Sequence, residues 1–171
     1  MPLAFGSRNW SSFEFQRDVW NAYLAGESGL LHAATGTGKT LAVWWGPLLE
    51  YMHESQEPRA TRKLRRSAAL PLRILWITPL RALAADTTEA LLEPVADLAL
   101  PWTVETRTGD TSASSRLRQS RRLPTALVTT PESLSILLSK ERASEQFADL
   151  RAVVVDEWHE LIGSKRGTMT E

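Results

Sequence analysis

Cysteine is absent from the 171 residues of the sequence. Its absence excludes disulfide scaffolds, cysteine-based zinc sites and thiol nucleophiles within the chain, and it fits a reducing compartment. No apolar run reaches the roughly 18 residues that a membrane span needs, and residues 1–8 have neither the basic region nor the apolar region of a signal peptide. We therefore expect a cytoplasmic protein without a membrane partner.

The chain also lacks a net charge, because 20 Lys and Arg balance 20 Asp and Glu. Any contact with a polyanion must then be local. Two segments are basic, residues 58–71 and the cluster Arg116, Arg118, Arg121 and Arg122, and for both a solvated surface is the alternative to an anion contact. Hydrophobic residues at 43% and charged residues at 23% are close to globular averages, so the composition predicts a folded domain.

The apolar pattern predicts the fold class. Capping-box spacing from Ser11 to Glu14, followed by apolar residues at helical intervals up to Gly26, predicts a first helix. Short apolar runs then alternate with longer periodic segments, as in βα units on a parallel sheet. The expected strands are residues 29–33, 73–78, 103–107, 126–129 and 152–156, and the runs 74–77 and 152–155 are apolar on both faces, which favours central positions. We predict an α/β fold with a mainly parallel sheet.

A glycine-rich segment joins the first expected strand to the next helix. Its glycines allow backbone N–H groups to turn toward a phosphate, whose charge the helix start also stabilises. In such a P-loop, Lys39 reaches the β- and γ-phosphates and the Thr40 hydroxyl binds Mg²⁺. Ala33 replaces the first glycine of the general pattern, and an ordinary turn is the alternative. The predicted phosphate-binding residues are Thr35, Gly36, Thr37, Gly38, Lys39 and Thr40.

An acidic pair closes the last expected strand. Ligands of open α/β sheets lie beyond the carboxyl ends of the strands, so the Asp156 carboxylate is placed to meet Mg²⁺. Glu157 is placed to orient or deprotonate an attacking water molecule. A helix N-cap is the alternative for the pair taken alone, and its occurrence with a P-loop favours the metal site. The cofactors that we predict are ATP and Mg²⁺.

The four residues Asp156-Glu157-Trp158-His159 resemble the DExH box of superfamily 2 helicases, whose phosphate loop commonly begins with alanine. Residues 76–83, 107–111 and 156–167 resemble the large-helicase-related family, and within it the ligase-associated DNA-damage-response DEXH-box helicases. The resemblance covers residues 15–171 and implies a three-layer RecA-like domain. It also implies that Gln16 recognises adenine and that His159 couples the ATP site to nucleic acid. A solvent-facing residue is the alternative for both.

The same resemblance implies nucleic-acid contacts at three motifs, each of which follows an expected strand. Thr78 and Thr130 precede prolines at expected helix starts, where each can cap a helix whose N–H groups face a backbone phosphate. Arg81 and Arg107 can pair directly with phosphates, independently of base sequence. A helix start without a ligand is the alternative for both Thr-Pro pairs. The predicted nucleic-acid residues are Thr78, Pro79, Arg81, Arg107, Thr108, Gly109, Asp110, Thr130, Pro131 and Glu132.

The function that the resemblance implies is ATP-driven 3′ to 5′ translocation on single-stranded DNA with duplex unwinding, in DNA repair. It further implies a second RecA-like domain in the same polypeptide and a DNA ligase or nuclease as a repair partner. The rival functions are an RNA helicase, a P-loop kinase or GTPase, and a passive nucleic-acid-binding module with a vestigial ATP site. We expect an N-terminal helical segment at residues 1–26 and the RecA-like domain at residues 27–171.

Two parts of a complete motor are missing from the 171 residues. We find neither the Ser-Ala-Thr motif that usually follows the DExH box nor a second domain with an arginine finger. Such a finger contributes about 10³ to 10⁵ in rate in related phosphoryl transfer. We therefore expect a chain truncated at its C-terminus, with weak nucleotide binding and almost no turnover from residues 1–171 alone.

Overall fold

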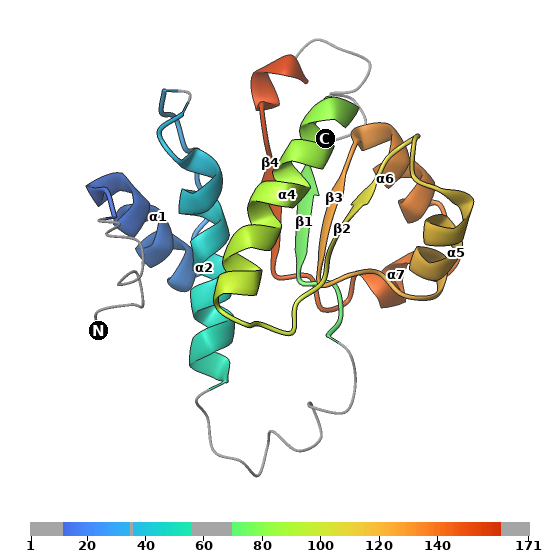
Figure 1. Ribbon diagram of the computed structural model, residues 1–171, viewed down its shortest axis with the longest axis horizontal. Coiled ribbons are helices and arrows are strands. Elements are labelled where there is room, and N and C mark those ends of the chain that lie inside the picture. The colour runs from blue at the N-terminus through green and yellow to red at the C-terminus, as the bar shows by residue number, and fades with distance from the viewer. Residues whose placement is uncertain (1–11, 35, 56–69, 162–171) are drawn as a thin grey trace. The chain divides into compact units, whose positions relative to one another are not determined.

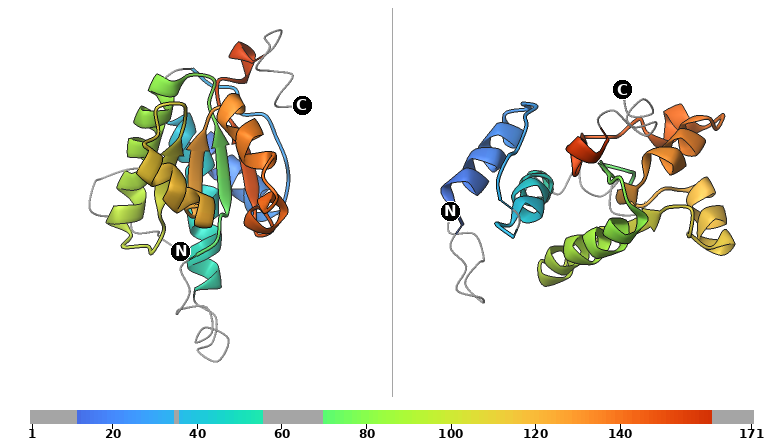
Figure 2. Two further views of the ribbon diagram at one scale, coloured as in Figure 1. Left: turned by 90° about the vertical axis from the view of Figure 1, so that its right-hand side faces the viewer. Right: turned by 90° about the horizontal axis from the view of Figure 1, so that it is seen from above.

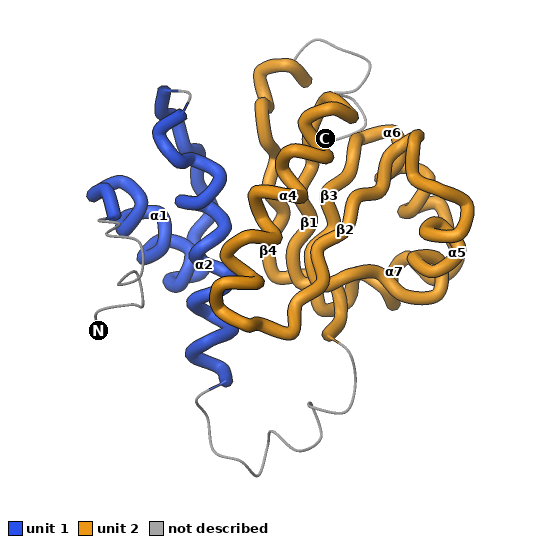
Figure 3. The backbone as a smooth tube through the Cα atoms, viewed as in Figure 1, with its two compact units in different colours: residues 1–57 blue, residues 58–171 orange. Residues whose placement is uncertain are grey.

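The computed structural model describes residues 12–34, 36–55 and 70–161 (Figure 1). The chain divides into two compact units, residues 1–57 and residues 58–171 (Figure 3). We call them unit 1 and unit 2, and the elements of each unit pack mainly against one another. The domain boundary expected between residues 26 and 27 stays a prediction. No helix within the described ranges is both long enough and apolar enough to cross a membrane.

Unit 1 consists of two packed helices, α1 (Glu14–Leu24) and α2 (Lys39–Glu54). The Trp20 ring lies against the Trp45 ring, with centroids 6.4 Å apart. Gly46 of α2 faces Tyr23 so closely that an added Cβ would lie 2.8 Å from the Tyr23 ring. The helices therefore approach closely because position 46 has no side chain, and the Tyr23 hydroxyl can donate to Glu50 at 2.8 Å.

Helix α1 begins later than its capping box predicts. Its N-cap is Phe13, whose backbone N–H donates to the Gln16 side chain at 3.1 Å, and Ser11 lies outside the described residues. The reciprocal half of a capping box thus comes from Gln16 at the third helical position, not from Glu14. The predicted end of the helix is confirmed, because Gly26 follows the C-cap with φ of +77°.

Unit 2 is built on a four-stranded parallel sheet with the strand order β2-β3-β1-β4 (Figure 1). Each strand has four residues, and the bounds of all four agree with the sequence prediction to within one residue at each end. Short strands separated by helical segments, three of them mainly apolar, are typical of parallel sheets covered on both faces. The strands are β1 (Ile74–Ile77), β2 (Val104–Arg107), β3 (Ala126–Thr129) and β4 (Ala152–Val155).

Helices cover both faces of this sheet (Figure 2). Helix α4 (Arg81–Asp97) packs on one face against β2 and β3. On the other face Leu75, Ile77 and Leu127 form a core with Leu134 and Leu137 of α6. The predicted three-layer α/β architecture is therefore confirmed. The remaining elements of unit 2 are α5 (Ala113–Arg121), α6 (Pro131–Leu138), α7 (Ala143–Gln146) and η2 (Trp158–Glu160).

Two strand predictions are wrong in the described structure. Residues 29–33 form no strand, since a strand requires a hydrogen-bonded neighbour and all four sheet strands pair among themselves. Strand β4 is not central but outermost in the sheet, and Val153 and Val155 are 52% and 40% exposed. The inner positions belong to β1 and β3, both buried along their full length.

Candidate functional site

The glycine-rich segment of unit 1 has the geometry of a phosphate-binding turn. Gly36 and Gly38 have φ of +78° and +83°, a left-handed conformation that glycine adopts without steric cost. Gly38 is the N-cap of α2, which begins at Lys39. The free N–H groups of this first turn and the positive end of the helix favour an anion there. The predicted glycine-rich turn before a helix is confirmed, although residues 12–34, which precede it, contain no strand.

Two side chains fold back onto this loop. The Lys39 ammonium donates to the Ala33 carbonyl at 2.7 Å, and the Thr37 hydroxyl donates to the Ala34 carbonyl at 2.7 Å. A lysine held over its own loop is positioned to meet a phosphate that the loop cradles. Thr40 follows in the first turn of α2, whereas Thr35 lies outside the described residues.

Gln16 lies beside the P-loop, although 22 residues separate it from Gly38. Its side-chain nitrogen is 3.4 Å from the Gly38 carbonyl oxygen, and a Cβ at position 38 would lie 3.0 Å from the same nitrogen. Only 9% of Gln16 is exposed. The alternative of a solvent-facing helix residue is therefore wrong. Recognition of adenine by Gln16 stays a prediction.

The residues present fit a nucleotide phosphate with Mg²⁺. The loop combines two left-handed glycines, a helix start and a lysine, which together suit a phosphate. The predicted metal ligands, the Thr40 hydroxyl and the Asp156 carboxylate, are the oxygen donors that Mg²⁺ prefers. Thr40 belongs to unit 1 and Asp156 belongs to unit 2.

The acidic pair of unit 2 follows β4 directly. Asp156 is tied to β1, because its backbone N–H donates to the Ile77 carbonyl at 2.8 Å. Its carboxylate accepts from the Glu157 backbone N–H at 3.0 Å and from the Trp76 indole at 3.4 Å. Trp76 belongs to the apolar run of β1, and the sequence offers no signal for this polar contact.

Glu157 has a backbone conformation that is rare for its residue type. Its φ of +46° places a non-glycine residue in the left-handed region at the start of η2. Such conformations are costly and cluster at functional sites. Glu157 occupies the N-cap position of η2, as the alternative to a metal site has it, but its side chain makes no capping hydrogen bond. His159 lies between Glu157 and Glu160, with nitrogen–oxygen distances of 3.5 and 3.6 Å, and its coupling role stays a prediction.

Parallel pairing brings the predicted nucleic-acid motifs to one edge of the sheet. Thr78, Thr108, Thr130 and Asp156 each follow one of the four strands, so all lie at the carboxyl edge. The motif after β1 contacts the motif after β2 directly, through an ion pair of 3.1 Å between Arg81 and Asp110.

Gly109 lies beneath the Arg81 side chain. An added Cβ at position 109 would lie 2.7 Å from the central guanidinium carbon of Arg81. Its own loop is held by short-range bonds, since the Thr108 N–H donates to the Thr111 hydroxyl at 2.8 Å and the Asp110 N–H donates to the Thr108 hydroxyl at 3.3 Å. The glycine thus allows an exposed arginine to rest on an ordered loop.

The two Thr-Pro motifs differ in their helix starts. Thr130 is the N-cap of α6, Pro131 is its first residue and Glu132 lies in the first turn, as predicted. The Thr130 hydroxyl approaches Ser133 at 3.4 Å and does not cap the backbone. Helix α4 has Leu80 as its N-cap, two residues after Thr78, so the capping role predicted for Thr78 is wrong. The Thr78 hydroxyl is buried and has no hydrogen-bond partner among the described residues.

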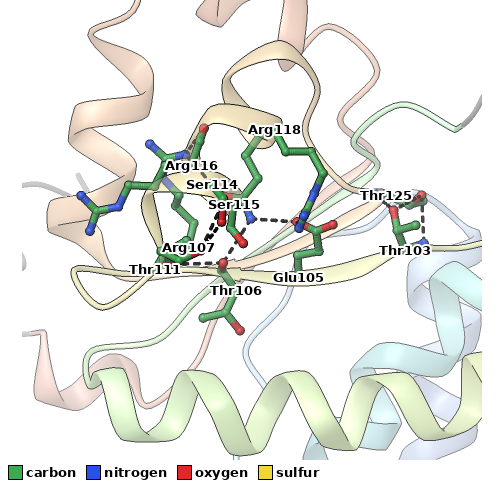
Figure 4. Close-up of polar contacts among 12 residues, drawn as sticks. Thr103, Glu105, Thr106, Arg107, Thr111, Ser114, Ser115, Arg116, Arg118 and Thr125 are labelled. Atoms are coloured by element: carbon green, nitrogen blue, oxygen red, sulfur yellow. Dashed lines mark hydrogen bonds and ion pairs between the residues drawn. The ribbon is translucent and has the colours of Figure 1, made fainter.

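Arg107 is one of the residues whose polar contacts Figure 4 draws. It is buried, with 7% of its surface exposed. Its guanidinium donates to the Arg116 carbonyl and to the Gln119 side chain, both at 3.3 Å. Burial lowers the pKa of Arg107, and the neighbouring Arg116 charge lowers it further. In this position Arg107 supports α5 and does not present its charge at the surface, contrary to the expectation of direct phosphate pairing.

Helix α5 holds the loop after β2, a role that sequence analysis missed. The Arg116 guanidinium donates to the carbonyls of Thr108 and Gly109. Arg118 pairs with Glu105 at 3.0 Å. Arg122, which follows α5, donates to the Leu70 carbonyl at 2.9 Å. Three of the four arginines of the basic cluster therefore bind the protein itself. The four arginines near a glycine-containing loop were visible in the sequence, but which carbonyls they meet depends on how α5 folds back.

The sequence and structure are similar to those of known helicases. A family model described as DEAD/DEAH box helicase matches residues 13–171. The Lhr helicase/uracil glycosylase of Escherichia coli (strain K12) is 35% identical over 162 residues, which cover 89% of this chain and 10% of that protein. The ATP-dependent helicase Lhr-Core of Sulfolobus acidocaldarius is 34% identical over 148 residues, which cover 83% of this chain and 16% of that protein.

Among solved structures, the helicase Lhr of Mycobacterium smegmatis bound to ssDNA and AMP-PNP matches with a TM-score of 0.73 and 31% identity, over 93% of this chain and 20% of that chain. The chain thus spans between 10% and 20% of the length of these relatives. Its parallel sheet and helix layers are those of a RecA-like helicase domain. The chain belongs to the DEAD/DEAH box helicase family, and the relatives named above are Lhr-type helicases.

Proposed function

We propose that this chain is the ATP-binding motor domain of a helicase that translocates 3′ to 5′ on single-stranded DNA. The observation that carries the proposal is the P-loop of unit 1, where Gly36 and Gly38 are left-handed and Lys39 folds over the loop at the start of α2. The similar helicase Lhr of M. smegmatis is bound to ssDNA and AMP-PNP. This supports a nucleic acid and a nucleotide as the two ligands of this chain.

In this proposal the two units supply different parts of one ATP site. Lys39 and the loop N–H groups hold the β- and γ-phosphates, while Gln16 recognises the adenine. Bound Mg²⁺ would neutralise phosphate charge, with Thr40 and Asp156 as its protein ligands. Glu157 orients the attacking water and accepts its proton, and positioning and electrostatic stabilisation are the main catalytic contributions.

The nucleic-acid path runs along the carboxyl edge of the unit 2 sheet. Arg81 is an exposed cation at that edge, and the first turns of α4 and α6 add backbone N–H groups that can face phosphates. Such contacts bind the backbone and not the bases, which suits a motor that moves along any sequence. The DNA repair role, the second RecA-like domain and a ligase or nuclease partner are proposed from the family resemblance.

The test compares ATP hydrolysis by the whole protein with and without Lys39→Ala. We expect the substitution to reduce hydrolysis stimulated by single-stranded DNA about 10²- to 10³-fold, because it removes a charge from the phosphate site. Lys140→Ala in unit 2, outside the P-loop, serves as the matched control and should leave hydrolysis unchanged. Equal stimulation by single-stranded RNA would favour the RNA helicase, and unchanged unwinding by Lys39→Ala would favour the passive module.

A further inference from the structure

Trp76 and Asp156 meet on one face of the unit 2 sheet. Strands β1 and β4 are parallel, with Trp76 opposite Val154. Side chains alternate between the faces of a strand, so Asp156, two residues after Val154, lies on the side of Trp76. The indole nitrogen reaches along the strand direction and donates to the Asp156 carboxylate at 3.4 Å.

Both oxygens of this carboxylate have a donor from the fold. Oδ2 accepts from Trp76, and Oδ1 accepts from the Glu157 backbone N–H at 3.0 Å. Each carboxylate oxygen has two lone pairs, so each keeps acceptor capacity for a cation. An indole only donates, so Trp76 itself cannot ligate a metal. The two donors therefore orient the carboxylate and leave it free to bind.

Among the described residues of unit 2, strand β1 holds Asp156 in place through Trp76 and Ile77. Trp76 is 2% exposed, so its ring is held by the core, whereas Asp156 is only partly buried. On the opposite face of β4, Val153 and Val155 are 52% and 40% exposed. The distance of 3.4 Å is longer than the usual value of about 2.9–3.0 Å, so this hydrogen bond is a weak one and its effect on the carboxylate must be measured.

We propose that Trp76 is a positioning residue for Asp156, whose carboxylate it holds in the orientation that binds the Mg²⁺ of the ATP complex. The inference rests on the proposed ATPase function. Outer partners of metal-binding carboxylates are part of a metal site, and their loss typically costs about 10- to 100-fold in metal affinity. If Trp76 only filled space in the core, loss of its N–H group would not change the metal affinity.

The experiment measures metal binding without turnover. Mn²⁺ replaces Mg²⁺, and its affinity for the whole protein with AMP-PNP is followed by electron paramagnetic resonance. Trp76→Phe keeps an aromatic ring and removes the N–H, and we expect it to weaken Mn²⁺ binding about tenfold. In ATPase assays the Mg²⁺ concentration at half-maximal rate should rise by the same factor, with a much smaller change in kcat at saturating Mg²⁺.

Two further variants separate positioning from packing. Replacement of Trp76 by 3-benzothienylalanine keeps the ring shape and loses only the N–H, so it should weaken Mn²⁺ binding as Trp76→Phe does. Trp102→Phe truncates another buried tryptophan, located before β2 at the opposite edge of the same sheet, and should leave Mn²⁺ affinity unchanged.

The outcomes are distinguishable. Wild-type Mn²⁺ affinity in the benzothienyl variant would overturn the inference even if Trp76→Phe fails to fold, because the shape of the core is then intact. A similar loss in Trp102→Phe would also overturn it, since the effect would then come from general destabilisation. If the wild-type protein with AMP-PNP binds no Mn²⁺, the proposed function itself fails, and the inference fails with it.

Discussion

Gly109 matters through the space that it leaves for a side chain and not through its backbone conformation. Its φ lies outside the left-handed region, and the space that a Cβ would need is filled by the Arg81 guanidinium. The residue therefore determines where the exposed arginine of the sheet edge rests. That arginine is the group that we propose for direct phosphate contact, so its placement can be tested through nucleic-acid binding.

We expect Gly109→Ala to displace Arg81 and to weaken binding of a labelled single-stranded oligonucleotide. Loss of one phosphate contact should reduce the slope of log affinity against log salt by about 0.7, as measured by fluorescence anisotropy over a salt series. Arg81→Ala should give the same reduction. Gly29→Ala is the matched control, because a Cβ there meets nothing within 4 Å. A full salt slope in Gly109→Ala would refute the dependence of Arg81 on this glycine.

At the scale of elements, a buried glutamine is one of the residues that dock α5 on the edge strand β2. The Gln119 amide nitrogen donates to the Thr106 carbonyl at 3.2 Å and to Glu105 at 2.9 Å, and its oxygen accepts from Arg107. Only 1% of Gln119 is exposed. An edge strand leaves unpaired backbone groups, and here a side chain satisfies one of them.

Gln119→Leu should therefore destabilise the chain by about 2 kcal/mol, because it leaves buried polar groups without partners. Urea-induced unfolding measures the change in the free energy of unfolding. Arg121→Ala replaces an exposed residue of the same helix and should change that free energy by less than about 0.5 kcal/mol. Equal stability of Gln119→Leu and wild type would show that α5 docks mainly through other contacts.

Sequence patterns predicted most strands and helices of this fold, but not which strands lie next to each other in the sheet. The runs 74–77, 126–129 and 152–155 were expected as strands, and all three are strands in the sheet. An apolar run on both faces looks the same in sequence whether a strand has one neighbour or two. The pattern therefore favoured a central β4, while the pairing of β1 with both β3 and β4 places β4 outermost.

For the whole molecule, the central proposal is that one nucleotide contacts both units. Lys39 lies in unit 1 and Asp156 lies in unit 2, so a ligand held by both would stabilise the two units together. A ligand that binds only the native state adds about 2.7 kcal/mol at a concentration of 100 Kd. This coupling should be visible in thermal unfolding.

We expect AMP-PNP with Mg²⁺ to raise the Tm of the whole protein. Lys39→Ala and Asp156→Asn should each remove most of the increase, although the two residues belong to different units. The double variant should lose little more than either single variant, because residues that share one ligand are not additive. A normal increase in Asp156→Asn would place the nucleotide on unit 1 alone and would contradict a shared site. Omission of Mg²⁺ should remove the contribution of Asp156.

The sequence by itself determined the chemistry that this protein can carry, because the P-loop, the acidic pair and the Thr-Pro motifs are local patterns with fixed spacing. It also determined that the strands are parallel, since helical segments separate them. Only the tertiary structure decided which of these side chains are exposed and which other residues they contact. Packing buried Arg107 under α5, placed Arg81 over Gly109 and brought Trp76 to Asp156, 80 residues away. Contacts between distant residues depend on strand order and helix docking, and one strand or helix taken alone contains no information about either.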